Sequence, residues 1–198
     1  MASLRERKKA ETRHRIADAA TSMFVERGFD NVTIADIAEA ADVSKVTVFN
    51  YFPRKEDIFF DRIPQAHDLL TTAIRERHAN EPPLRALRRL FVDLAEQHHP
   101  LGGFEDSLPR FWRTVLGSAA LRARAREAIE ELEAHLAELL AGTDPHPRLT
   151  AALVMAAYRT VYTETATRML TSATTDEVTA DHVAAIERTF DILTGGLT

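Results

Sequence analysis

The chain of 198 residues contains no cysteine. Disulfide bonds, thiolate metal sites and cysteine nucleophiles are therefore excluded, which fits a protein of a reducing compartment. Glycine (7) and proline (8) are also few, and they separate segments rather than recur within them. A chain that is poor in these helix breakers and rich in alanine, leucine, arginine and glutamate is predicted to be all-α.

Long hydrophobic runs are absent as well. No stretch approaches the roughly 18 apolar residues that a membrane-spanning helix needs. The first 30 residues are charged and lack the apolar centre of a secretory signal. We therefore expect a soluble, cytoplasmic protein with no membrane partner.

Catalytic and metal-binding motifs are also missing from the sequence. We find no Ser-His-Asp arrangement, no HExxH motif and no phosphate-binding loop. The adjacent His98 and His99 point apart on a helix, and no carboxylate is spaced to join them in a metal site. We expect no enzymatic activity, no cofactor and no metal.

Charge is distributed unevenly along the chain. The net charge is −5, but the first 15 residues hold six basic and two acidic side chains. Residues 61–198 hold 15 of the 25 basic residues and 20 of the 30 acidic ones, which gives this region a net charge of −5. A basic end on an acidic body points to a polyanionic partner, although a solvated, frayed terminus has the same composition.

Apolar residues near the N-terminus predict a first helix over 10–27. Its buried stripe is formed at helical spacing by Ile16, Ala19, Ala20, Met23 and Phe24. Gly28 follows, where a left-handed turn can end the helix. Thr33 then opens a second, short helix, and Asp36 three positions later suits a capping box.

A third short helix follows a tight turn. Asp42 stands where a left-handed residue is needed, and Ser44 is placed to cap the helix. Val48 and Phe52 can face inward together, and Pro53 ends the helix. Residues 33–52 therefore read as helix, short turn, helix, which is a helix-turn-helix.

Beyond residue 54 the chain is predicted to be helical, with segments at 55–79, 83–99, 105–117, 118–141, 147–172 and 179–195. Pro64 is expected to kink or break the first segment. The segment 147–172 is apolar almost all round, which predicts burial on more than one side. In the last segment an apolar seam for a partner helix is formed by Val183, Ile186, Phe190 and Leu193.

The stretches "IADAATSMFVERGFDNVT" and "IADIAEAADVSKVTVFNYFPRKEDIF" together resemble the DNA-binding domain of the TetR family of bacterial transcriptional regulators, over about residues 10–60. The matching features are the Phe before a Gly-Phe turn, the capping Thr, the run of aromatics after Thr47 and the "KED" that follows. The resemblance implies a helix-turn-helix DNA-binding domain at 1–54 and a helical effector-binding and dimerisation domain at 55–198.

The resemblance also implies a function. Members of the family usually repress transcription from a palindromic operator in double-stranded DNA, and a small-molecule effector releases them. They dimerise through the last two long helices, which would place Val183, Ile186, Phe190 and Leu193 in a homodimer interface. We therefore expect a repressor that is released by a small, partly apolar effector.

Several residues match DNA-contacting positions of the family. Thr33 matches the capping threonine near a phosphate, and Lys55 matches a lysine that meets a phosphate. Ser44, Lys45 and Thr47 match the start of the recognition helix, where base edges are read. By chemistry, Lys45 suits guanine, the Thr47 methyl group suits a thymine methyl group, and an Asn at position 50 suits adenine.

Two positions depart from the family pattern. Position 46 is often a small residue and position 49 is most often a tyrosine whose hydroxyl meets a phosphate, whereas this chain has Val46 and Phe49. Both side chains offer apolar contacts to thymine methyl groups. Tyr51 either supplies a hydroxyl in place of the one that Phe49 lacks or packs inside. Asn50 is the last of the residues predicted to contact DNA.

The basic N-terminal segment leaves two alternatives open. Its cations are Arg5, Arg7, Lys8 and Lys9. They form either a mobile tail or an arm that becomes ordered on the minor groove of DNA.

Aromatic residues in the C-terminal region are candidates for an effector pocket. They are Phe91, Phe104, Phe111, Trp112, Tyr158 and Tyr162. Trp112 and the two tyrosines bring a polar group to an apolar wall, as ligand pockets require, although each residue also suits an ordinary core. A different function remains open, a helical binding or scaffold module that keeps the fold without reading a specific operator.

Overall fold

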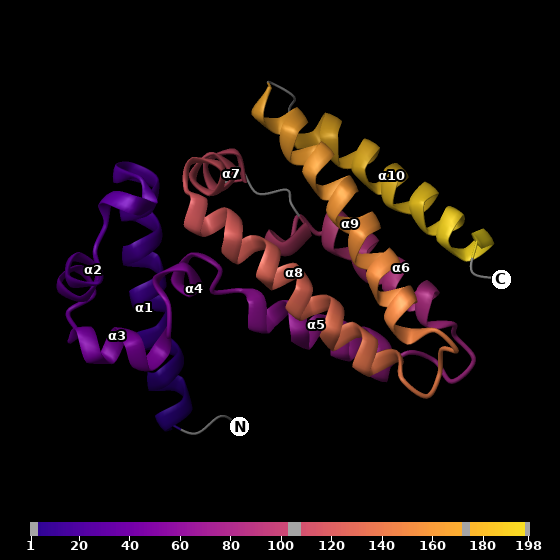
Figure 1. The fold of residues 1–198 in the computed structure, drawn as a ribbon, viewed down its shortest axis with the longest axis horizontal. Helices are drawn as coiled ribbons and strands as arrows, with labels where there is room; N and C mark the ends of the chain where they lie inside the picture. The colour runs from indigo at the N-terminus through magenta and orange to yellow at the C-terminus, as the bar shows by residue number, and fades with distance from the viewer. Residues whose placement is uncertain (1–3, 103–107, 172–174, 197–198) are drawn as a thin grey trace. The chain divides into compact units, whose positions relative to one another are not determined.

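The computed structural model describes residues 4–102, 108–171 and 175–196, and these residues form helices and turns without a β-strand (Figure 1). The predicted all-α fold is confirmed. The helices are α1 (Leu4–Arg27), α2 (Ile34–Ala40), α3 (Lys45–Tyr51), α4 (Lys55–Phe59), α5 (Ile63–Arg75), α6 (Pro83–Glu96), α7 (Leu108–Gly117), α8 (Ala119–Leu140), α9 (Pro147–Leu170) and α10 (Thr175–Gly196), with 3-10 turns η1 (Phe29–Asn31) and η2 (Pro100–Gly102). Within the described ranges, no helix combines the length and apolar character that crossing a bilayer requires.

The chain forms two compact units. The first comprises residues 1–61 and 110–126, and the second comprises residues 62–109 and 127–198. The sequence placed the boundary at residue 54, but Ile58 and Phe59 of α4 are buried in the core of the first unit. Phe111 of α7 stacks on Phe59 with the ring centroids 4.8 Å apart. The first unit is therefore larger than the helix-turn-helix pattern indicates, because a segment far along the chain completes its core.

The core of the first unit is built on one face of α1. Ile16, Ala20 and Phe24 are fully buried there, as their spacing predicts. The helix ends at Arg27, and Gly28 has a φ of +82°, a backbone conformation that residues with a Cβ rarely adopt. The turn brings Phe29 onto Phe24 with the ring centroids 4.8 Å apart, so η1 closes over the end of α1.

The turn chemistry of the helix-turn-helix is as the sequence predicts. The Thr33 hydroxyl accepts a hydrogen bond from the Asp36 N–H at 3.2 Å, and the Asp36 carboxylate accepts one from the Thr33 N–H at 2.7 Å, which completes the capping box of α2. Asp42 has a φ of +50° in the connecting turn. Ser44 caps α3 by accepting a hydrogen bond from the Thr47 N–H at 3.0 Å.

Prolines mark the starts of three helices in the second unit. Pro64 lies in the first turn of α5, Pro83 in that of α6 and Pro147 in that of α9. This position suits proline, because the first turn of a helix leaves its N–H groups without helical partners. The expected break at Pro64 is confirmed, since α4 ends at Phe59. Of the predicted helix 105–117, residues 105–107 lie outside the described ranges.

The apolar face of α10 packs within the protomer. α10 lies against α6 and α9, and Ile186, Phe190 and Leu193 are all buried, with Phe190 and Phe91 ring centroids 5.9 Å apart. These three side chains therefore pack inside the protomer instead of forming the predicted homodimer seam. Val183, on the same face of α10, is half-buried. Apolar spacing marks a face that needs burial, but it does not say whether the partner belongs to the same chain.

A histidine is buried between the last two helices. His182 of α10 is only 2% exposed, and its Nδ1 lies 2.6 Å from the Thr165 hydroxyl oxygen of α9. Burial disfavours the charged imidazolium and lowers the pKa of His182 to about 4. The imidazole is thus neutral in the folded second unit at pH 7.

This burial predicts an acid-sensitive second unit. Because the folded-state pKa lies below the unfolded value near 6.5, the unfolded chain binds more protons between pH 6.5 and 4. The free energy of unfolding should therefore fall as pH drops through that window, by about 3 kcal/mol from this residue alone. The check is urea unfolding followed by circular dichroism at pH 6.5, 5.5 and 4.5.

Because other groups also titrate, each variant is compared by how much its free energy of unfolding decreases between pH 6.5 and 4.5, and not by its stability at one pH. We expect a smaller loss for His182→Gln and an unchanged loss for His78→Gln, since His78 is exposed on the same unit. Equal losses in the wild type and His182→Gln would show that this histidine does not cause the acid sensitivity.

Candidate nucleic-acid interface and pocket

The outer face of α3 carries most of the residues predicted to contact DNA. Ser44, Lys45, Val46, Phe49 and Asn50 are exposed, and the Thr47 side chain is half-buried. Val46 is 69% and Phe49 51% exposed, although both are apolar. The structure thus brings these residues together on one surface.

The inner face of α3 is anchored in the first unit. Val48 and Phe52 are at most 1% exposed, as predicted. Arg13 of α1 donates a hydrogen bond from Nη1 to the Tyr51 carbonyl oxygen at 2.9 Å, and its guanidinium lies 4.1 Å from the centroid of the Phe52 ring. These contacts hold the C-terminal end of α3 by a charged hydrogen bond and a cation–π interaction.

Tyr51 was predicted either to offer a hydroxyl or to pack inside. Its side chain is partly buried and packs against the core of the first unit. The structure therefore shows the Tyr51 side chain packed against the core, which is the second of the two alternatives.

Thr33 lies at the start of α2 with its polar groups engaged locally. Its hydroxyl donates to Asp36 Oδ2 at 2.8 Å while it accepts from the Asp36 N–H. The Thr33 backbone N–H is the main cause that lowers the pKa of the Asp36 carboxyl below its ordinary value. The predicted phosphate contact of Thr33 stays a prediction, and the structure shows its hydroxyl already used in the cap.

Lys55, predicted to meet a phosphate, is turned toward η1. Its Nζ donates to the Phe29 carbonyl oxygen at 2.6 Å and lies 4.0 Å from the centroid of the Phe29 ring. Burial is the main cause that lowers the pKa of Lys55 below its ordinary value, and the nearby Asp30 works against this shift. An ammonium group has three N–H donors, so the contact with Phe29 uses one of them, and the phosphate contact stays a prediction.

Two further polar contacts within the first unit were not predicted. The Ser118 hydroxyl donates to Asp30 at 2.9 Å, and Arg124 Nε lies 2.7 Å from Asp57 Oδ1. They hold η1 and α4 to the segment 110–126. Nothing in the spacing of these residues signals the pairs, because each joins positions far apart in the chain.

The basic N-terminal residues are helical rather than extended. Arg5, Arg7, Lys8 and Lys9 lie on the exposed first turns of α1. Arg13, which also lies among the first 15 residues, instead contacts Tyr51 and Phe52 at the end of α3.

The aromatic residues predicted for an effector pocket fall into two groups. In the second unit, Phe91 and Tyr158 stack with ring centroids 4.2 Å apart, and Tyr162 lies 5.9 Å from Tyr158. The Tyr158 hydroxyl donates to the Leu101 carbonyl oxygen at 2.7 Å, and burial raises the pKa of Tyr158 well above its ordinary range. Phe111 and Trp112 instead pack against the core of the first unit, and Phe104 lies outside the described residues.

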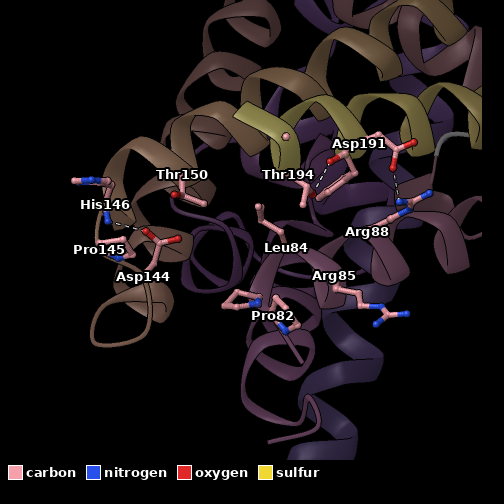
Figure 2. Close-up of a pocket in the computed structure, with 13 residues that line it drawn as sticks. Pro82, Leu84, Arg85, Arg88, Asp144, Pro145, His146, Thr150, Asp191 and Thr194 are labelled. Carbon is pink, nitrogen blue, oxygen red and sulfur yellow. Dashed lines mark hydrogen bonds and ion pairs between the residues drawn. The ribbon is translucent and has the colours of Figure 1, made fainter. Parts of the chain in front are cut away.

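A pocket of about 760 Å³ opens elsewhere in the second unit (Figure 2). It lies among the first turns of α6, the start of α9 and the last turns of α10. Its lining is apolar at Pro82, Pro83, Leu84, Pro145 and Phe190, and polar at Arg85, Arg88, Asp144, His146, Thr150, Asp191 and Thr194, and Gly195 completes it. None of the aromatic residues predicted for an effector pocket is among them.

The polar lining of this pocket is partly satisfied within the protein. Arg88 pairs with Asp191 at 2.7 Å, and the His146 backbone N–H donates to Asp144 at 2.7 Å (Figure 2). Leu84 points into the space between Thr150 and Thr194. The pocket therefore offers an apolar interior with a polar rim, the composition typical of sites for small molecules.

Comparisons with known proteins agree with the helix-turn-helix geometry. Residues 16–61 match the family model described as bacterial regulatory proteins, tetR family. A curated relative, the HTH-type transcriptional regulator TcmR of Streptomyces glaucescens, is 29% identical over 171 residues, which cover 81% of this chain and 76% of TcmR.

Solved structures extend the likeness to the whole fold. The chain is similar to Thermus thermophilus FadR, a TetR-family transcriptional repressor solved in complex with lauroyl-CoA, with 29% identity and a TM-score of 0.60 over 94% of this chain and 95% of FadR. NalD of Pseudomonas aeruginosa, the secondary repressor of the MexAB-OprM multidrug efflux pump, has a TM-score of 0.58 at 17% identity over 97% of this chain and 98% of NalD. The second likeness shows the fold alone.

The position of Lys55 yields a test of its structural role. Lys55→Met removes the hydrogen bond to Phe29 and the contact with the Phe29 ring, so the free energy of unfolding of the first unit should fall by about 1–3 kcal/mol. Trp112 is the single tryptophan of the chain and packs against this core, so its fluorescence during urea unfolding reports on the first unit.

Lys45→Met is the matched control, because Lys45 is exposed on α3. Its unfolding curve should stay within about 0.5 kcal/mol of the wild type. An unchanged curve for Lys55→Met would show that the inward contact does not stabilise the first unit.

Proposed function

Since this chain belongs to the TetR family of bacterial transcriptional regulators, we propose that it represses transcription by binding a palindromic operator as a homodimer and that a small, partly apolar effector releases it. The observation that carries the proposal is the outer face of α3. There Lys45 and Asn50, two residue types that hydrogen-bond base edges, are exposed on a helix capped by Ser44 and anchored through Val48. Such a protein acts in the cytoplasm, where the operator DNA is.

The proposed DNA contacts are of two kinds, those that read base edges and those that position α3 on the DNA backbone. Lys45, Thr47 and Asn50 would meet base edges in the major groove, while Ser44, Thr33 and Lys55 would meet phosphates. Arg13 would act only by fixing the direction of α3, because its guanidinium is bound to Tyr51 and Phe52. In a dimer, two such helices would lie about 34–36 Å apart and enter successive major grooves.

The dimer surface that we propose is the outer side of α9 and α10. Leu149 and Leu153, one turn apart on α9, are 52% and 37% exposed, and Ile192 of α10 is 75% exposed. These apolar side chains would be buried by a second copy, whereas Phe190 on the opposite side of α10 already fills the core of the protomer.

Operator binding is tested by titrating duplex DNA taken from upstream of the protein's own gene at 50–200 mM salt. We expect binding at least about 10³-fold tighter than to random duplex and a steep loss of affinity with salt, since released counterions dominate the free energy of binding. Lys45→Met should weaken operator binding by about 10- to 100-fold. Arg75→Met, at an exposed cation on α5, is the control and should change little.

Sedimentation of the same complex gives its stoichiometry. We expect two chains per operator, and Ile192→Arg should leave folded monomers that bind weakly. A flat salt dependence without preference for the upstream duplex would refute operator binding and favour a helical scaffold module instead. A dimer that survives Ile192→Arg would refute only the proposed dimer surface.

The effector site that we propose is the pocket around Leu84. Its apolar lining suits the apolar part of a ligand, and its volume of about 760 Å³ suits a small molecule. The ligand would release the operator by favouring a conformation in which the two copies of α3 no longer fit successive major grooves. The cluster of Phe91, Tyr158 and Tyr162 is the alternative site.

The two sites are distinguished with 1-anilinonaphthalene-8-sulfonate, an amphipathic fluorescent probe. Leu84→Trp should fill the pocket and weaken probe binding at least about tenfold without changing operator affinity, because the indole would occupy the apolar interior. Tyr162→Ala should leave probe binding unchanged. The reverse result would assign the site to the aromatic cluster.

A further inference from the structure

The centre of the DNA-reading face of α3 is apolar. Val46 and Phe49 are 69% and 51% exposed. Among the described residues of the first unit, the other large exposed apolar side chains are Leu4, Val25 and Leu116, and none of these stands one turn from another. Within the described part of this unit, the pair on α3 is therefore the one place where two such side chains lie one turn apart and form a continuous apolar surface.

Helix geometry places this pair between the polar reading residues. At about 100° per residue, Phe49 lies about 40° and Val46 about 100° around the helix axis from Lys45, and Asn50 lies about 140° from it. The order across the exposed face is Lys45, Phe49, Val46, Asn50. Val48 lies on the opposite side and is fully buried. Val46 and Phe49 would therefore contact any molecule that binds the outer face of α3.

The major groove contains one apolar group that such a pair can recognise. Every base edge there presents hydrogen-bond donors or acceptors, and only thymine adds a methyl group, at C5. α3 itself carries Lys45 and no acidic residue, so the apolar surface lies on an element whose charge suits DNA. An apolar patch on a partner protein would match Val46 and Phe49 but would give Lys45 and Asn50 no hydrogen-bonding partners.

We propose that Val46 and Phe49 read the C5-methyl groups of thymines in two neighbouring base pairs of each operator half-site. The two residues are about 4.5 Å apart along the helix axis, which compares with about 3.4 Å between successive bases of a strand. Lys45 and Asn50 would flank these thymines and contact the edges of the adjacent base pairs. The proposal rests on operator binding by α3 and adds the base composition that α3 prefers.

The test replaces thymine by uracil, which keeps every hydrogen-bonding group and removes only the methyl. The preferred half-site is first selected from randomised duplexes with the full chain, and each thymine is then replaced in turn. Burial of one methyl group is worth about 0.8 kcal/mol, so each of two neighbouring replacements should weaken binding about fourfold. Replacements elsewhere should have little effect.

Variants assign the effect to residues. In Val46→Ala and Phe49→Ala the penalty for uracil should disappear at one of the two positions each, because the apolar contact is lost. Val25→Ala, at an exposed valine on α1, is the control and should keep both penalties. Thr47→Ser removes the methyl group of a residue placed at the base edges, so it tests whether Thr47 makes the methyl contact instead. All four changes lie outside the buried core, so the variants should fold as the wild type does.

The outcomes separate the two proposals. Failure to select any preferred sequence would overturn operator binding itself. A preferred sequence that binds equally well with uracil at every position would overturn methyl reading and leave operator binding intact. A penalty that persists in both alanine variants but vanishes in Thr47→Ser would assign the methyl contact to Thr47 and also overturn the proposal.

Discussion

A helix of seven residues has too few hydrogen bonds to be stable in water by itself, and α3 is such a helix. Its existence therefore depends on the burial of Val48 and Phe52 in the core of the first unit. Because one side of so short a helix is committed to the core, the opposite side must face solvent or a partner. The exposed face of α3 is in this sense a consequence of how α3 is anchored.

The anchoring extends well beyond the helix-turn-helix. Lys55 of α4 ties η1 through the Phe29 carbonyl oxygen, and Ser118 ties it through Asp30. The ion pair of Arg124 with Asp57 holds α4 to the segment 110–126, with Arg124 largely removed from solvent. Charged hydrogen bonds in such surroundings restrict orientation more than ion pairs on an open surface do. The support of α3 thus comes from residues that share no local pattern with it.

The sequence predicted the local chemistry of the first unit well. The cap at Ser44, the box of Thr33 with Asp36 and the positive φ of Asp42 each follow from a residue type and its immediate neighbours. The burial of α10 was predicted in the same way, but its partner was not. The spacing that predicted a homodimer seam is that of any buried helix face, and α6 of the same chain covers it. The pocket around Leu84 was missed because three separate chain segments form it.

The sequence by itself determined the all-α fold, the helix-turn-helix and the residue types on α3, because these depend on interactions within a few positions of one another. Only the tertiary structure decided where the cations point. Arg13 lies in the basic N-terminal segment and Lys55 was predicted to meet a phosphate, yet the charged group of each is turned toward a backbone carbonyl oxygen and an aromatic ring. It also decided that Val46 and Phe49 lie in the middle of an exposed face. Their exposure depends on which side of α3 the core occupies, and contacts between distant segments settle that question.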